Sequence, residues 1–431
     1  MNTFRKLAPL KGFLILWASQ AISNLGSSMT SFALIIWVYQ QNGTAQSVTL
    51  LSFFTYLPSI LFSFVAGTLA DRWDKKRVML VCDAFAACGT LSVLLLHQAG
   101  ALQIWHLYLV NFLISFMNAF QYPAANVATS LLVPPEHYHR ASGLQGFSGS
   151  LVSVLTPALA TAVLSFGGLR VVFLVDLATF AIAFLSLLLF IRIPAILHDE
   201  DGKATPFLKS VWSGLRFLRA NKVLLELILY MSFINLLAYF TGYGILPAMI
   251  LARSGNNQTV LGMVSSAIGV GMLVGSLLVT VLPRPKNRTR VVFLTMAFSF
   301  CFGDLVWGAG RTAWLWVLAS FFGNMLVPFA TAGMTTIMRT KVPLAMQGRV
   351  FSARDTVQFF TIPLALFLSG YLADHVFEPF MAGTSALRNF WVPLVGAGKG
   401  SGMAILFLFT GVAGVVSSLL CLRAKKFREL D

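Results

Sequence analysis

Three acidic side chains lie inside long apolar stretches of this sequence, at Asp83, Asp176 and Asp304. A low-dielectric interior favours the neutral, protonated form of a carboxylic acid over the charged form. Such a group can take up and release protons, or it can be a structural acid that is hydrogen-bonded near a helix end. We expect these three acids to be the candidate proton-coupling residues, and both interpretations stay open at this point.

A second chemically informative feature is the basic stretch GTLADRWDKKRV, residues 67–78, which lies between two apolar runs. An acid in a short basic connection can cap the N-terminus of a neighbouring helix and pair with a cation. The stretch therefore predicts a conformational latch in a protein that alternates between states. The candidate latch residues are Gly67, Asp71, Arg72, Lys75, Lys76 and Arg77.

Polar residues recur at helical spacing within several apolar runs. The run near residues 13–38 carries Gln20, Asn24, Ser27 and Ser31, and the run near 104–132 carries Asn111, Ser115, Asn118 and Tyr122. Spacings of four, three and four place each set on one helix face. Such faces meet water, a ligand or another helix. The later apolar runs add Asn235, Tyr239, Tyr243, Asn324, Thr331 and Thr335.

These polar faces predict a mostly neutral central cavity with many aromatic side chains, suited to a bulky lipophilic solute. Hydrogen bonding between helices is the alternative use of each residue. The predicted substrate-binding residues are Gln20, Asn24, Asn118, Tyr122, Asn235 and Tyr239.

The elements that must position these residues are membrane-spanning helices. The chain has 431 residues, of which 57% are hydrophobic and 11% are charged. Apolar runs of about 20 residues recur from end to end, each long enough to cross a hydrocarbon core of about 30 Å. We predict an all-α polytopic membrane protein with twelve spans. They lie near residues 13–38, 47–70, 78–97, 104–132, 141–166, 171–191, 223–251, 259–282, 291–309, 313–338, 350–374 and 401–421.

The net charge of +16 follows the connections between these spans. Most of the 31 Lys and Arg residues fall in the alternate tails and loops that begin with the N-terminal tail. By the positive-inside rule, both termini are expected to be cytoplasmic and the number of spans even. The charge also favours contact with anionic lipid rather than nucleic acid.

One plainly polar segment, residues 192–222, divides the chain into two sets of six spans. Its second part interleaves apolar and basic residues and predicts a helix at the cytoplasmic membrane face. We therefore expect an N-terminal half at 1–191, a cytoplasmic linker at 192–222 and a C-terminal half at 223–431. The pairs Val133-Pro134 and Val342-Pro343, each followed by an arginine six residues after the proline, indicate a duplication. The outer loop at 376–400 carries no predicted role.

Several motifs are absent from the sequence. It contains no GxxxxGK[ST] phosphate-binding loop, which argues against an ATP-driven pump. The four cysteines have no metal-like spacing, and no nucleophile stands with a convincing base. We expect a protein that is not an enzyme and uses no metal or organic cofactor.

Gly67, Leu69, Ala70, Asp71, Arg72 and Lys76 resemble the loop 2–3 signature of the major facilitator superfamily, with Asp74 at its usual glycine and Lys75 at its usual arginine. This form, together with FQYPAANVATSLLVP, QGRVFSARD and LSGYLAD, resembles the proton-driven branch that includes macrolide-efflux proteins. Two features depart from that pattern. Ile114 stands where antiporters often carry an arginine, and the fifth-span glycine–proline motif is reduced to Thr156-Pro157.

The resemblance implies a twelve-helix major facilitator fold with two six-helix pseudo-repeats. It also implies efflux of amphipathic or lipophilic molecules from a bacterial plasma (inner) membrane, driven by the proton gradient through alternating access and associated with antibiotic resistance. The expected partners are a small lipophilic substrate, protons and membrane lipid, with the protein acting as a monomer. Alternatives are a dedicated exporter of an endogenous siderophore or peptide product, a lysophospholipid flippase and, from another class, a non-transporting membrane receptor.

Overall fold

The computed structural model describes residues 10–194, 207–283, 285–343 and 346–431, and within these ranges it contains helices and no strand. The described chain divides into two compact units. The first unit holds residues 10–37 and 54–194, and the second holds residues 38–53 together with the chain from 207 onward. The connection between the first two long helices, with the helix ends next to it, therefore belongs to the second unit. The predicted boundaries at 191 and 223 stay a prediction.

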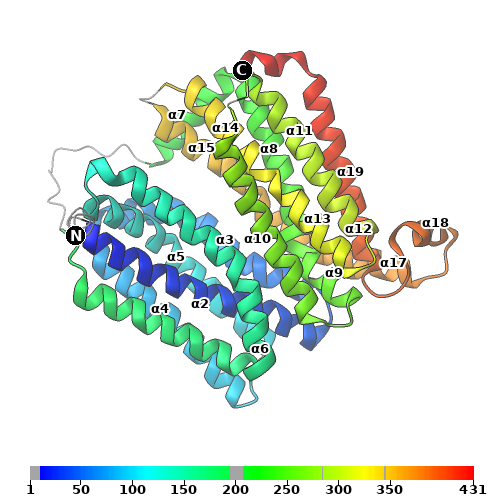
Figure 1. The fold of residues 1–431 in the computed structure, drawn as a ribbon, viewed down its shortest axis with the longest axis horizontal. Helices are drawn as coiled ribbons and strands as arrows, with labels where there is room; N and C mark the ends of the chain where they lie inside the picture. Colours follow the sequence, from blue (N-terminus) through cyan, green and yellow to red (C-terminus); the bar gives the residue numbers. More distant parts are fainter. Residues whose placement is uncertain (1–9, 195–206, 284, 344–345) are drawn as a thin grey trace. The chain divides into compact units, whose positions relative to one another are not determined.

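The first unit is built from long helices, of which α4 packs against both α5 and α6 (Figure 1). Its elements are α2 (Lys11–Asn42), α3 (Ala45–Arg72), α4 (Lys75–Gln98), α5 (Ile104–Leu132), the short 3₁₀ turn η2 (Pro135–His137) and α6 (Tyr138–Phe190), with the adjoining ends of α2 and α3 in the second unit.

Helix α6 contains 53 residues and is interrupted at Gly168, whose backbone has φ 65° and ψ −171°. A continuous helix of that length would extend about 80 Å at 1.5 Å per residue, far more than a bilayer core of about 30 Å. Glycine adopts the positive φ without steric cost, so the chain turns here. The interruption lies between the predicted spans 141–166 and 171–191, and α6 therefore contributes two spans.

After residues 38–53, the second unit continues with α7 (Phe207–Ala220) and is rich in interrupted helices. The remaining elements are α8 (Lys222–Phe240), η3 (Thr241–Ile245), α9 (Leu246–Arg253), α10 (Gln258–Val281), α11 (Arg288–Phe300), η4 (Cys301–Leu305), α12 (Val306–Ala309), α13 (Ala313–Met325), α14 (Val327–Lys341), α15 (Gln347–Phe359), α16 (Thr361–Leu372), η6 (Ala373–Phe377), α17 (Glu378–Ala382), α18 (Ala386–Val395), α19 (Ser401–Arg423) and η7 (Lys425–Leu430).

The segments η3 and η4 are π-helical turns inside predicted spans, and η6 is a π-helical turn at the end of the predicted span 350–374. A π-turn inserts an extra residue into an α-helix and shifts the direction of the side chains around it, often at functional positions. Hydrophobic periodicity predicts the spans that contain η3 and η4 as uninterrupted helices, because one extra residue hardly changes the apolar pattern.

Ten helical segments among the described residues are long and apolar enough to cross a membrane. One of them, Arg140–Phe190, holds two spans. Helix α5 is also long enough at 29 residues, but its polar side chains lower its hydropathy below that of the ten. Together these segments form the twelve-span architecture predicted from the sequence.

Close approach of backbones holds some of these helices together. Gly271 and Gly275 lie four residues apart on α10 and face α13. A Cβ atom on Gly275 would lie 2.0 Å from the carbonyl oxygen of Met325, and one on Gly271 would lie 2.4 Å from that of Phe321. Small residues at this spacing let membrane helices pack without side chains between them.

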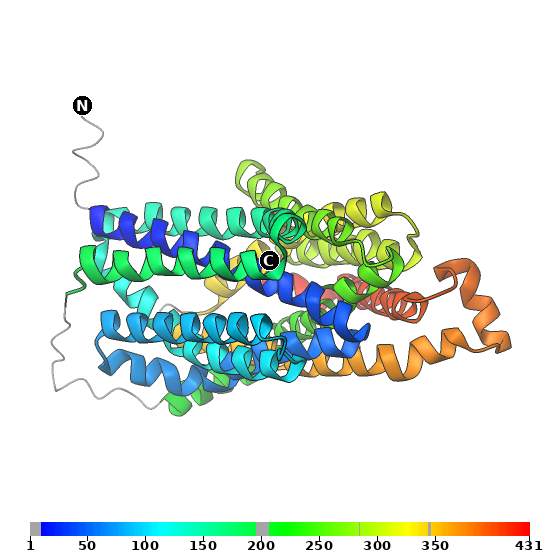
Figure 2. The same ribbon diagram turned by 90° about the horizontal axis from the view of Figure 1, so that it is seen from below.

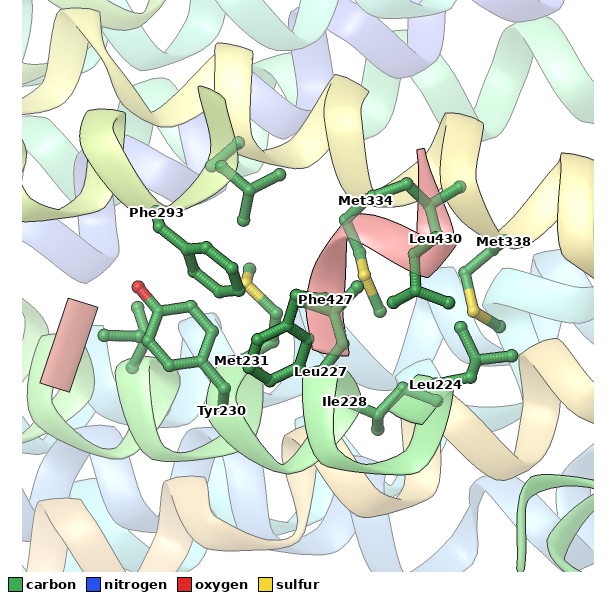
Figure 3. Close-up of a cluster of buried hydrophobic side chains, with 14 of the residues drawn as sticks. Leu224, Leu227, Ile228, Tyr230, Met231, Phe293, Met334, Met338, Phe427 and Leu430 are labelled. Atoms are coloured by element: carbon green, nitrogen blue, oxygen red, sulfur yellow. The ribbon is translucent and has the colours of Figure 1, made fainter. Parts of the chain in front are cut away.

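A hydrophobic cluster in the second unit joins α8, α11 and α14 to the chain after α19 (Figure 3). Phe427 and Leu430 of η7 are buried there, and the ring of Phe427 lies 5.0 Å from that of Phe293. The Asp431 carboxylate accepts hydrogen bonds from the backbone N–H and hydroxyl of Thr289, both at 2.7 Å, in the first turn of α11. The segment after the last span is therefore part of the folded core.

Helices α17 and α18 extend beyond the ends of the longer helices of their unit (Figures 1 and 2). The Glu378 carboxylate accepts hydrogen bonds from the N–H groups of Gly400 (3.1 Å) and Met403 (2.9 Å) and so caps α19. The Arg253 guanidinium donates to the carbonyls of Gly310 (3.1 Å) and Val395. Segment 376–400 is thus an ordered connection that contains helices α17 and α18 and is hydrogen-bonded to its unit at both ends.

Candidate functional site

The second unit contains a cavity of about 130 Å³, partly lined by polar side chains, near the π-turns η3 and η4. The cavity wall combines amide, hydroxyl and carboxyl groups with aromatic rings, and its residues come from α8, η3, α11, η4, α12, α13 and α14. Its polar and aromatic lining includes Asn235, Thr241, Tyr243, Asp304, Trp307 and Asn324. A mixed wall of this kind can hydrogen-bond one part of a solute and pack against another.

Asp304 is the carboxyl group of this cavity, and its residue is only 7% exposed. Its Oδ1 atom accepts hydrogen bonds from the hydroxyls of Thr241 (2.7 Å) and Thr410 (3.1 Å). Thr241 stands at the start of η3 and Asp304 within η4, so the two π-turns place the pair in contact. The lining acid and its two hydroxyls come from three different spans.

The first unit contains a cavity of about 200 Å³ with a similar character. Its polar lining includes Asn24, Ser27, Thr90, Asn111, Asn118 and Asp176. Asp176 is 3% exposed and accepts hydrogen bonds from the hydroxyls of Ser27 (2.9 Å) and Thr90 (3.2 Å). Burial of a carboxylate is compensated here by neutral hydroxyl donors.

A larger hollow of about 430 Å³, also in the first unit, is lined by Gln20, Asn24 and Tyr122. Asp83 is 6% exposed and lies against Gln20. Its two oxygens accept hydrogen bonds from the amide nitrogens of Gln20 (3.3 Å) and Gln121 (2.5 Å). Sequence reasoning did not select Gln121, although a glutamine in an apolar run is the signal that could have found it.

Five of the six predicted substrate-binding residues line these three cavities. The sixth, Tyr239, is not among the lining residues; its ring stacks on that of Tyr243, with centroids 4.6 Å apart. Ser115 lies on the same polar helix face as Asn118. Its hydroxyl donates to the carbonyl of Thr55 at 2.5 Å and links α5 to α3. Residues of the polar helix faces therefore line cavities in some places and connect helices in others.

The predicted latch lies partly outside the described side chains, since those of residues 63–72, which include Gly67, Asp71 and Arg72, are not described. The backbone shows that α3 continues to Arg72, so the stretch GTLADR is helical rather than a loop. Only Trp73 and Asp74 separate α3 from α4.

The cations that follow contact helix ends of the same unit. Lys76 donates to the carbonyls of Leu188 (2.9 Å) and Ile191 (2.7 Å) at the C-terminal end of α6, where a positive charge is favourable. Lys75 is buried and donates to the carbonyl of Trp73 at 2.9 Å. Arg77 donates its backbone N–H to the Asp74 carboxylate at 2.8 Å, which makes Asp74 the N-cap of α4.

A capping acid that sequence reasoning did not single out is Asp374 in η6. Its carboxylate accepts hydrogen bonds from the N–H groups of Ala45 (3.0 Å) and Gln46 (2.7 Å) in the first turn of α3. A Cβ atom on Gly370 would lie 2.6 Å from the Cα atom of Gln46, so glycine permits the approach. The signal was present in the sequence, because GYLAD at residues 370–374 repeats GTLAD at residues 67–71.

The described residues contain no group of three His, Cys, Asp or Glu side chains that could hold a metal ion. The polar groups of the cavities are suited to noncovalent binding of a solute, and the buried carboxyl groups are suited to binding and releasing a proton.

Comparison with known proteins agrees with this arrangement. The sequence matches the Major Facilitator Superfamily over residues 16–366. It is 25% identical over 423 residues to macrolide efflux protein A of Streptococcus pyogenes, covering 97% of both chains. It is also 25% identical over 369 residues to the enterobactin exporter EntS of Shigella boydii, covering 85% of this chain and 81% of the exporter.

The fold is similar to that of the crystal structure of a mutant nucleoside transporter NupG, with a TM-score of 0.69 and 14% identity over 95% of this chain and 98% of that one. Together with the twelve spans, these similarities show that the chain belongs to the Major Facilitator Superfamily and is a multi-pass membrane transporter rather than an enzyme.

Proposed function

We propose that this chain exports amphipathic or lipophilic small molecules in exchange for protons. The observation that carries the proposal is that each unit has a cavity whose wall combines apolar surface, neutral polar groups and one buried carboxyl group. Neither Asp176 nor Asp304 has a cationic partner among the described residues. A carboxylate without a cation can gain a proton without breaking an ion pair. The proton gradient would then supply the energy for export.

The cavity walls support a substrate that is polar at several points but carries little charge. Amide and hydroxyl groups can bind the ester, ketone and hydroxyl groups of such a molecule, while aromatic side chains contact its apolar parts. The proposed contacts are Gln20, Asn24, Asn118, Tyr122, Asn235 and Tyr239. The relation to macrolide efflux protein A makes a macrolide the first compound to test.

A second candidate is the dedicated export of one endogenous product of the siderophore class. The similarity to an enterobactin exporter favours this candidate. The same cavities and coupling acids would serve it, so only the range of exported compounds separates the two functions.

The contact of Asp374 with α3 supports a cycle of alternating access. It connects the start of the second span to the end of the eleventh span. GTLAD lies at the other end of the second span. We place the protein in a bacterial inner membrane as a monomer with both termini in the cytoplasm, so that this contact acts as an outer latch. Asp71, with its basic neighbours, would act as the inner latch.

The test is the accumulation of labelled erythromycin in a bacterium lacking its own exporters, with and without this protein. Export coupled to protons lowers accumulation, and a protonophore restores it. Asp304→Asn is expected to abolish the difference at equal membrane expression. Unchanged accumulation of erythromycin and of a lipophilic dye would reject the broad exporter and leave the dedicated one, which is tested with catecholate siderophores. Export that persists with the protonophore would reject proton coupling.

A further inference from the structure

The carboxyl clusters of the two units are built from equivalent helices. In the first unit, Asp176 lies on the sixth span and meets Ser27 of the first and Thr90 of the third. In the second unit, Asp304 lies on the third span of that half and meets hydroxyls of its first and sixth. The same three helix positions thus supply one carboxyl and two hydroxyl groups in each half, although the acid has changed helix.

Hydroxyl partners suit a carboxyl group that changes its protonation state. A hydroxyl donates to a carboxylate and accepts from a carboxylic acid, so it satisfies both forms. In the second unit, the proton of each hydroxyl group also has an alternative acceptor. The Thr241 hydroxyl lies 3.0 Å from the Leu237 carbonyl, and the Thr410 hydroxyl lies 3.1 Å from the Leu406 carbonyl.

The position of these hydroxyls also indicates where a proton would be held in the second unit. Both donate to Oδ1 of Asp304 and neither donates to Oδ2. A proton on Oδ2 therefore displaces neither hydrogen bond. Tyr243 lines the same cavity and is a further titratable side chain there.

Asp83 has partners of a different kind. The amide nitrogens of Gln20 and Gln121 donate to its two oxygens, and an NH₂ group cannot accept a proton in return. A proton on Asp83 would therefore find no acceptor in either amide nitrogen. These amide donors favour the charged form over the protonated form and are suited to a structural role.

We propose that Asp176 and Asp304, each with its two hydroxyls, form a duplicated pair of proton-binding sites, one in each six-helix half, and that Asp83 is not one of them. The role of these sites in transport rests on the proposed function. Proton binding by the clusters does not depend on it.

The first test is infrared spectroscopy of the purified full chain in phosphatidylethanolamine–phosphatidylglycerol vesicles across a pH titration. Protonated carboxylic acids are recognised by a C=O stretching band that shifts in D₂O. We expect one such band to disappear in Asp176→Asn and another in Asp304→Asn, while both persist in Asp83→Asn. A missing band for either cluster, or a band lost in Asp83→Asn, would overturn the proposal.

The second test exchanges the positions of acid and hydroxyl within the first unit. Asp176→Thr removes the acid, and the double variant Asp176→Thr/Thr90→Asp recreates the arrangement of the second unit. In vesicles, the single variant should lose the accumulation of labelled erythromycin that a pH gradient drives, and the double variant should regain that accumulation.

The outcomes separate the two proposals. If the double variant does not regain accumulation at equal incorporation into vesicles, the two carboxyl sites are not equivalent. Absence of erythromycin accumulation with the unmodified protein, with both infrared bands present, counts against the proposed substrate class and supports the proton sites.

Discussion

Oδ2 of Asp374 lies 2.7 Å from the backbone nitrogen of Gln46, and Oδ1 lies 3.0 Å from that of Ala45. The first turn of α3 is thereby capped by a side chain from a distant part of the sequence. This contact helps to explain why residues 38–53 belong to the second unit rather than to the first. It also gives the motif GYLAD the same capping chemistry that we expect of GTLAD.

Removal of this cap should loosen the start of α3. Loss of a capping side chain costs about 1 kcal/mol, which corresponds to about fivefold faster local opening. We expect Asp374→Ala to raise amide hydrogen exchange at Gln46 by this factor, as measured by mass spectrometry. Glu136→Ala, at an exposed residue, is the control. Unchanged exchange at Gln46 would show that the contact contributes nothing to the stability of α3.

The glycine contact between α10 and α13 predicts a steric penalty. Because a Cβ atom on Gly275 would lie 2.0 Å from the carbonyl oxygen of Met325, Gly275→Ala should destabilise the second unit by about 1–3 kcal/mol. The measurement is thermal unfolding of the purified protein. Gly146→Ala is the matched control, since no atom lies within 4 Å of its added Cβ. Equal unfolding temperatures for the two variants would contradict the close approach.

The N-cap of α4 predicts an order among three substitutions. Asp74→Ala removes the acceptor for Arg77 N–H and should cost about 1 kcal/mol. Asp74→Asn retains an oxygen at the same place, and Asp74→Gly should cost only a few tenths of a kcal/mol. Thermal unfolding compares the three. An alanine variant as stable as the asparagine variant would exclude a capping role.

The cavity amides predict effects on substrate affinity. Asn118 and Asn235 line cavities in different units, and loss of one hydrogen bond to substrate is worth about 1 kcal/mol. We expect Asn118→Ala and Asn235→Ala each to raise the KM for erythromycin transport about fivefold at unchanged expression. Asn389→Ala, at an exposed residue of α18, is the control. An unchanged KM in both cavity variants would remove these amides from the substrate site.

The sequence by itself determined the architecture. Span length, hydropathy and the interruption near Gly168 are local properties, because each helix must satisfy its own backbone hydrogen bonds in lipid. The polar helix faces could also be predicted from the sequence, since the helical period places residues three and four apart on one face. The family signature added the fold and the class of transporter.

Only the tertiary structure decided what each acid does, because its partners come from distant helices. Asp83 meets two amides, Asp176 and Asp304 each meet two hydroxyls, and Asp374 meets the start of α3. The hydropathy pattern also did not predict the π-turns at Thr241–Ile245 and Cys301–Leu305, since an extra residue barely alters hydropathy. A carboxyl group in lipid must be satisfied by neighbours that packing brings to it, and packing is not encoded in local spacing.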